Sequence, residues 1–118
     1  MNENLILRRI AELSGESIEF KDERILPGTA WIGEMPIDIT VKGCYTTLNS
    51  VGAFEGSRDT LAKSKWRGKG KFKALIPAIK QTLIEFGLEP CLYLTPLSPV
   101  WEKNYKLIED DGKWKIEL

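Results

Sequence analysis

A basic, glycine-containing stretch that runs directly into a helical pattern constrains this chain more than any other feature. Over residues 63–73, six basic residues stand at alternate positions with no acidic residue among them, and Gly68 and Gly70 lie in the middle. Apolar residues then recur at helical spacing from Phe72 to Phe86. Glycines let the backbone turn sharply, and the first turn of a helix presents N–H groups that attract anions, phosphates above all. The stretch therefore predicts a phosphate-binding loop at the start of a helix.

The composition excludes several kinds of site. The 118 residues predict one domain over residues 1–118, and the 17 basic residues are balanced by 17 acidic ones, so the basic cluster is local. The chain has no histidine, which excludes Ser-His-Asp and Cys-His catalysis, and we expect no metal site. The two cysteines, Cys44 and Cys91, are too few for a disulfide scaffold and indicate a reducing compartment. Because residues 5–7 are too short an apolar run for a signal peptide and no segment could span a bilayer, we expect a cytoplasmic protein.

The part of the chain before the basic stretch predicts a helix followed by strands. An apolar stripe at helical spacing predicts a helix over residues 4–13, which Gly15 ends. Alternating or apolar runs, separated by turn signals such as Pro27-Gly28, predict strands at residues 17–20, 29–33, 37–41 and 45–54. Residues 34–36 are expected to interrupt the strand pattern between the strands at 29–33 and 37–41. The last three of these strands follow one another closely and predict an antiparallel meander.

The part after the basic stretch predicts a helix that ends near Phe86, with Gly87 as its C-cap. Pro77 predicts either a kink in this helix or a separate first turn. A strand at residues 91–94, a short helix at 100–107 and a strand at 113–118 follow, and the strand–helix–strand passage predicts one parallel strand pair. The expected fold is therefore α+β, with one mixed, mainly antiparallel sheet flanked by helices.

Two short motifs resemble the GCN5-related N-acetyltransferases. The acyl-CoA loop of that family reads Arg or Gln, two residues, Gly, one residue, Gly or Ala; Arg67, Gly70 and Phe72 fall on the marked positions, with Phe72 replacing the small third residue. Residues 87–94 stand where the family has its fifth strand. Residues 100–108 are similar to the family's late motif Leu-Tyr-Glu-Lys-x-Gly-Phe, without its glycine.

The resemblance implies an acyl-CoA N-acyltransferase-like fold that uses acetyl-CoA as co-substrate and acetylates an amine of unknown identity. The preceding strand would pair with the pantetheine arm, through Val51, Ala53 and Phe54. The backbone of the glycine loop would hold the pyrophosphate, through Arg67, Gly68, Lys69, Gly70, Lys71 and Phe72.

The resemblance also implies catalytic roles. The tyrosine that protonates the leaving thiolate in the family corresponds to Trp101 here, and an indole N–H is no acid for this task. Tyr105, one turn later, is the substitute. Glu55, at the end of the expected third strand of the meander, is the candidate general base, and Asp59 is the second choice.

Two alternatives compete with the enzyme hypothesis. The Trp101 substitution favours a catalytically inactive protein of the same fold that serves as a binding or structural component, as some bacteriophage virion proteins resemble degenerate members of this family. The basic stretch, with Trp66 among its lysines, also suits a nucleic-acid backbone and one stacked base. Phe72 and Tyr105 can equally serve the core, and Cys91, inside an apolar strand, is expected to be inert.

Overall fold

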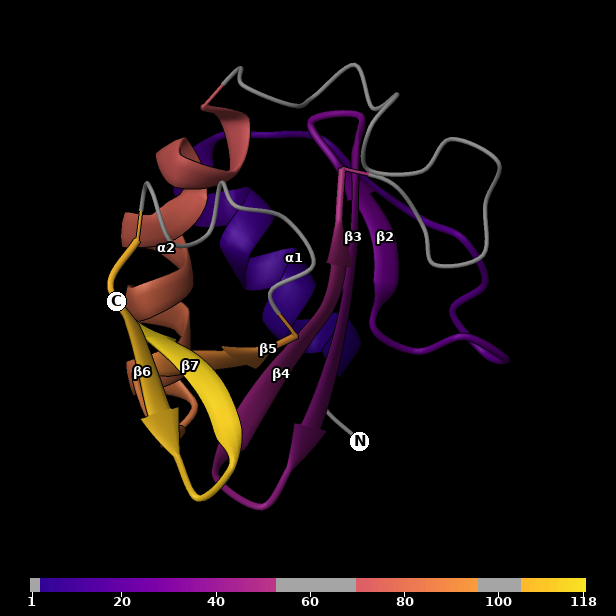
Figure 1. The fold of residues 1–118 in the computed structure, drawn as a ribbon. Coiled ribbons are helices and arrows are strands. Elements are labelled where there is room, and N and C mark those ends of the chain that lie inside the picture. The colour runs from indigo at the N-terminus through magenta and orange to yellow at the C-terminus, as the bar shows by residue number, and fades with distance from the viewer. Residues whose placement is uncertain (1–2, 53–69, 96–104) are drawn as a thin grey trace.

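The computed structural model of the protein describes residues 3–52, 70–95 and 105–118, which form two helices and a seven-stranded sheet (Figure 1). The elements in chain order are α1 Glu3–Ser14, β1 Ile18–Phe20, β2 Thr29–Ile32, β3 Met35–Lys42, β4 Tyr45–Val51, α2 Lys71–Glu85, β5 Cys91–Leu94, β6 Leu107–Asp110 and β7 Lys113–Glu117. The strands lie in the order β1-β2-β3-β4-β5-β7-β6, and every neighbouring pair is antiparallel except β4–β5. The expected α+β class, the antiparallel meander and the parallel pair are confirmed.

The hairpin between β2 and β3 is tighter than the sequence indicated. Only Gly33 and Glu34 separate the strands, and both have positive φ, 54° and 70°. Such a type I′ turn matches the twist of the two strands that it joins. Met35 therefore pairs directly with Ile32, and the expected break at residues 34–36 is wrong because Pro36 already lies inside β3.

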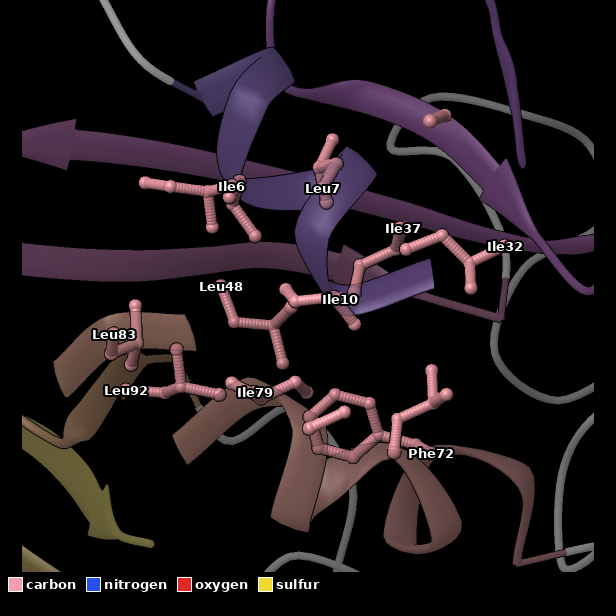
Figure 2. Packing of buried hydrophobic residues seen from close by; sticks show 14 of the residues in the cluster. Ile6, Leu7, Ile10, Ile32, Ile37, Leu48, Phe72, Ile79, Leu83 and Leu92 are labelled. Carbon is pink, nitrogen blue, oxygen red and sulfur yellow. The ribbon is translucent and has the colours of Figure 1, made fainter. Parts of the chain in front are cut away.

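Both helices pack against one face of the sheet, because the alternating apolar side chains of the strands point to that side (Figure 2). Along β3, the buried and half-buried residues alternate, as expected for a strand with one face in the core. The buried cluster includes Ile6, Leu7 and Ile10 of α1, Leu75, Ile79 and Leu83 of α2, and Ile32, Ile37, Leu48, Leu92 and Ile116 of the strands.

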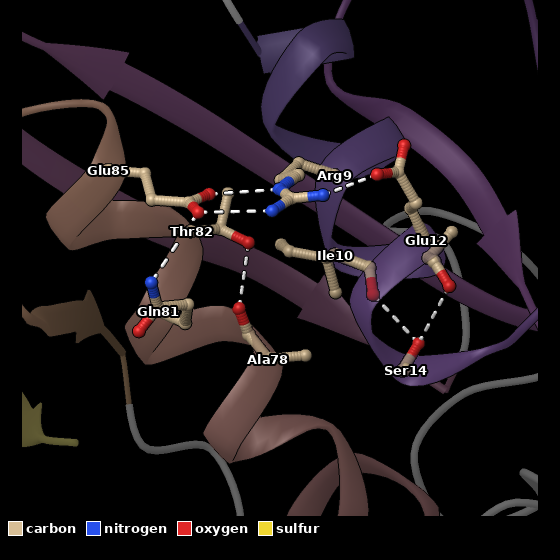
Figure 3. Close-up of polar contacts among 9 residues, drawn as sticks. Arg9, Ile10, Glu12, Ser14, Ala78, Gln81, Thr82 and Glu85 are labelled. Carbon is tan, nitrogen blue, oxygen red and sulfur yellow. Dashed lines mark hydrogen bonds and ion pairs between the residues drawn. The ribbon is translucent and has the colours of Figure 1, made fainter.

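An ion-pair network connects the two helices at the surface of this layer (Figure 3). The Arg9 guanidinium donates to both carboxylate oxygens of Glu85, at 2.9 and 3.1 Å, and also contacts Glu12. Below it, the buried Thr82 hydroxyl donates to the Ala78 carbonyl at 2.7 Å, so that its polar group is satisfied inside α2. The network links α1 to α2 at the surface, above the apolar contacts that pack the two helices together.

Helix α2 is one uninterrupted helix although Pro77 lies inside it.

The C-terminal end of α2 lies beside Gly87, as the sequence predicts, and it has a defined set of capping hydrogen bonds. Phe86 is the cap residue, and Gly87 follows with φ 72°. The Gly87 N–H donates to Ile84 O at 3.1 Å and the Leu88 N–H donates to Leu83 O at 2.8 Å. This pair of bonds is the Schellman motif, in which a glycine adopts the left-handed conformation.

Strand β3 extends beyond β2, and other groups take over its hydrogen bonds. The Ile39 N–H donates to Gly28 O at 2.9 Å, and the Val41 N–H donates to a carboxylate oxygen of Glu3 at 3.2 Å. Burial raises the pKa of Glu3, whereas hydrogen bonds from the backbone N–H groups of Glu3 and Val41 are among the interactions that lower it, and the pKa lies below its ordinary value. Glu3 thus acts as an ionised cap on the sheet.

The expected short helix over residues 100–107 is wrong at its described end. Tyr105 and Lys106 are not helical, and Leu107–Asp110 forms β6, which pairs with β7. Asp111 and Gly112, with φ 52° and 76°, make the two-residue turn between these strands. An Asp-Gly pair between alternating runs is a strong hairpin signal, and it overrides the helical spacing before it.

Candidate functional site

The two central strands of the sheet separate part of the way along. Strands β4 and β5 are paired in parallel at Thr46–Leu92 and Thr47–Tyr93, whereas β4 stays paired with β3 as far as Val51. From Leu48 onwards, β4 therefore has no strand on its β5 side within the described residues. In Figure 1, β5 lies at an angle to β4 rather than alongside its whole length. A strand with one unpaired edge is a template for a ligand that carries amide groups.

A β-bulge shapes the same part of β4. Leu48 is opposite Ile39 and Ser50 is opposite Asp38, so Asn49 is the extra residue. A bulge bends its strand and increases the local twist, and bulges are common beside binding sites. The Ser50 hydroxyl is buried there and, among the described residues, finds no hydrogen-bond partner. A ligand group at this edge could supply one.

Helix α2 begins without a side-chain cap. Gly70 is its N-cap residue, in the left-handed conformation with φ 69°, and no described side chain caps the helix start. The Ala74 N–H donates to Gly70 O at 3.0 Å, which is the first helical bond. A Cβ atom built on Gly70 would meet no atom of the described residues within 4 Å. As far as those residues go, this helix end therefore has space beside it and lacks a carboxylate or hydroxyl of its own at the cap position.

Lys71, the first residue of α2, is held by an internal acid. Its ammonium group lies 2.6 Å from a carboxylate oxygen of Glu16, with the two side chains 23% and 32% exposed. The pair lies over the β2–β3 turn, since a Cβ atom on Gly33 would come within 2.3 Å of Glu16 Oε2 and 2.7 Å of Lys71 Nζ. The Lys71 charge is thus already paired inside the protein.

Phe72 and Tyr105 lie together at the start of α2. The Phe72 side chain is 8% exposed and belongs to the core. The ring of Tyr105 packs edge-on against it, with the centroids 6.3 Å apart. Burial raises the pKa of Tyr105, so its phenol keeps its proton at neutral pH. Any role of Phe72 in ligand binding is therefore limited to its backbone.

The sequence-predicted site is only partly within the described residues. Gly70, Lys71, Phe72 and Tyr105 are brought together at the start of α2, and Val51 ends β4, half-buried against the core. The remaining predicted residues lie outside the described part of the chain: Ala53, Phe54, Glu55, Arg67, Gly68, Lys69, and also Trp101 and Asp59. Sequence reasoning missed Ser50, Glu16 and Gly33. The Gly33-Glu34 pair was a readable turn signal, but no local pattern indicates the partner of Glu16.

A second polar cluster lies where β4 begins, on β5, β6 and β7. The Tyr93 hydroxyl donates to Asp110 Oδ2 at 2.9 Å, Lys115 Nζ lies 3.5 Å from the same oxygen, and the Tyr45 ring packs on that of Tyr93. The bond to Asp110 raises the pKa of Tyr93 and lowers that of Asp110. Because these groups satisfy one another, the cluster serves to hold the strands together.

Cys91 is buried, as expected for an inert core thiol, while Cys44 is exposed and neither forms a disulfide. Burial raises the pKa of the Cys91 thiol, which makes it a poor nucleophile at neutral pH. Among the described residues, no three acidic or cysteine side chains are grouped to hold a metal ion. In the same part of the chain, no helix combines the length and apolar character needed to cross a bilayer.

Comparisons with known proteins find no matching family model, no matching curated protein and no matching solved structure.

Proposed function

We propose that this chain has an acyl-CoA N-acyltransferase-like fold and binds acetyl-CoA between the free edge of β4 and the start of α2. The observation that carries the proposal is the separation of β4 from β5 after Thr47. The pantetheine arm of CoA carries amide groups, which suit an unpaired strand edge. The pyrophosphate would lie at the helix start beside Gly70, where N–H groups and the helix dipole favour an anion.

The chemistry proposed for this site is transfer of the acetyl group to an amine. The amine nitrogen forms a bond to the acetyl carbon, the carbon–sulfur bond breaks, and the leaving thiolate takes a proton. Tyr105 is the candidate donor, because its phenol lies at the start of α2 and is protonated at neutral pH. Glu55 is the candidate base that takes the proton from the amine. The two roles thus fall to residues from different parts of the chain.

A binding protein without turnover is the second candidate. The packing of Tyr105 against Phe72 favours it, because a ring that completes the core needs no chemical role. The two candidates share the ligand and differ in whether thiol is released. The nucleic-acid alternative has one basic residue fewer than the sequence indicated, since Glu16 neutralises the Lys71 charge.

Calorimetric titration with acetyl-CoA tests the proposal. The informative variant is Gly70→Glu, which places a side chain and a negative charge at the helix start and should abolish binding. Gly43→Glu is a matched control. Gly43 lies in the β3–β4 turn and also has a positive φ, 61°. A Cβ atom added to it would likewise meet no described atom within 4 Å, so this variant should bind like wild type. Absence of wild-type binding at millimolar acetyl-CoA would refute the proposal.

Further assays separate the candidates. Release of free thiol in the presence of a panel of amines and peptides indicates the enzyme, while binding without release indicates the second candidate. Salt-dependent retention on DNA or RNA that is lost when Lys69 and Lys71 are changed to Glu would instead support a nucleic-acid binder.

A further inference from the structure

The Glu16–Lys71 ion pair joins three elements at the start of α2. Glu16 follows the end of α1, and its backbone N–H donates to Ala11 O at 2.9 Å. Gly33 lies in the β2–β3 turn, and its N–H donates to Ser17 O at 2.8 Å. Lys71 is the first residue of α2, and its ammonium reaches Glu16 Oε1 at 2.6 Å. The backbone on two sides of the pair is therefore fixed by hydrogen bonds.

The glycine at position 33 leaves the space that the pair occupies. Any larger residue there would place a Cβ atom within 2.3 Å of the Glu16 carboxylate and 2.7 Å of the Lys71 ammonium. Both side chains are about two-thirds or more covered, so the pair is less screened by water than a fully exposed one. The sequence places these residues 55 positions apart, and only the fold brings the acid to this cation.

We infer that Glu16 is an internal competitor for the ligand: its carboxylate takes up the Lys71 charge and thereby sets a lower affinity of the α2 start for phosphate-bearing ligands. The inference rests on the proposed acetyl-CoA site, because it concerns the same helix end. A ligand phosphate and the Glu16 carboxylate are both anions, so each would bind Lys71 at the expense of the other. Glu16 is thus a residue that determines affinity without touching the ligand.

Removal of the Glu16 charge should tighten binding. The Glu16→Gln variant frees one unit of positive charge beside the helix start, and a charge pair about 4 Å apart in a water-like medium corresponds to about fivefold in affinity. The Lys71→Gln variant should instead weaken binding by about fivefold, because it leaves the Glu16 carboxylate unpaired beside the helix start, where it repels a phosphate. In the Glu16→Gln background, Lys71→Gln should reverse the gain.

The experiment is calorimetric titration of acetyl-CoA into wild type, Glu16→Gln, Lys71→Gln and the double variant. Glu23→Gln is the matched control, because it makes the same change in net charge and breaks a comparable ion pair, that of Glu23 with Arg8 at 3.0 Å. Circular dichroism checks that each variant is folded. A gain for Glu16→Gln that is absent in Glu23→Gln and in the double variant supports the inference.

A second readout needs no bound ligand. Under limiting acetic anhydride, Lys71 of wild type should be labelled more slowly than the exposed Lys80, and Glu16→Gln should raise the labelling of Lys71 alone. Equal labelling of the two lysines in wild type would overturn the inference. Equal acetyl-CoA affinity of wild type and Glu16→Gln would overturn it while leaving the proposed function intact. Absence of binding by every variant would overturn the proposed function, and the inference with it.

Discussion

Changing Gly33 to alanine tests the structure at the point where the turn, the ion pair and α2 meet. Gly33 has φ 54°, a conformation that costs an alanine about 1 kcal/mol. Its new Cβ atom would also lie 2.3 Å from Glu16 Oε2, well inside contact distance. The Glu16 side chain can rotate away, so the second cost is the ion pair itself. A pair of this exposure contributes about 0.5–1 kcal/mol.

The two costs sum to a loss of about 1.5–2 kcal/mol in the free energy of unfolding. For a domain of this size that corresponds to a fall of roughly 6–8 °C in Tm. Urea denaturation followed by tryptophan fluorescence measures the free energy, and calorimetry measures Tm. In the Glu16→Gln background the ion pair is already absent, so Gly33→Ala should then cost only about 1 kcal/mol.

The difference between the two backgrounds is the decisive quantity. If Gly33→Ala cost the same with and without Glu16, the ion pair would not lie over the turn in solution. If it cost less than about 0.5 kcal/mol in wild type, the positive φ at this position would also be wrong. Gly43 lies at a turn with φ 61°, and no other described atom would touch a Cβ atom there, so Gly43→Ala measures the free-energy cost of the backbone conformation alone.

Other predictions concern the core, α2 and the response to acid. Leu83→Ala should cost about 2–5 kcal/mol in urea denaturation because Leu83 is 0% exposed, whereas Ile84→Ala, at 52% exposed, should stay within about 0.5 kcal/mol. Pro77→Ala should stabilise the protein by about 1–3 kcal/mol and raise Tm, because it restores the missing helical hydrogen bond to Lys73; an unchanged Tm would contradict this. The pKa of Glu3 is lowered in the folded state, so its contribution is present above the ordinary value of about 4.3 and is lost as the pH falls through the folded value. Glu3→Gln should therefore cost about 1–2 kcal/mol at pH 7 and nothing in strong acid, and an equal cost at both pH values would refute the ionised cap.

The sequence predicted those parts of the fold that depend on near neighbours. Helix α2 ends where Gly87 permits a left-handed residue, and β3 follows from its strict alternation. The parallel β4–β5 pair follows from a strand, a helix and a strand in succession. The two wrong predictions also concern neighbouring residues, because both involve two-residue turns. The Gly33-Glu34 turn was read as a break, and the Asp111-Gly112 turn, which makes β6 a strand, was overlooked.

The sequence by itself determined the α+β class and the presence of a helix directly after the glycines of the basic stretch, because backbone conformation and periodicity are encoded within a few residues. The tertiary structure decided what that helix start can do. It brought Glu16 to Lys71 across 55 positions, packed Tyr105 on Phe72, and separated β4 from β5 after Thr47. Contacts of this kind depend on how the helices pack on the sheet, and no local sequence pattern indicates which acidic residue will contact which basic residue.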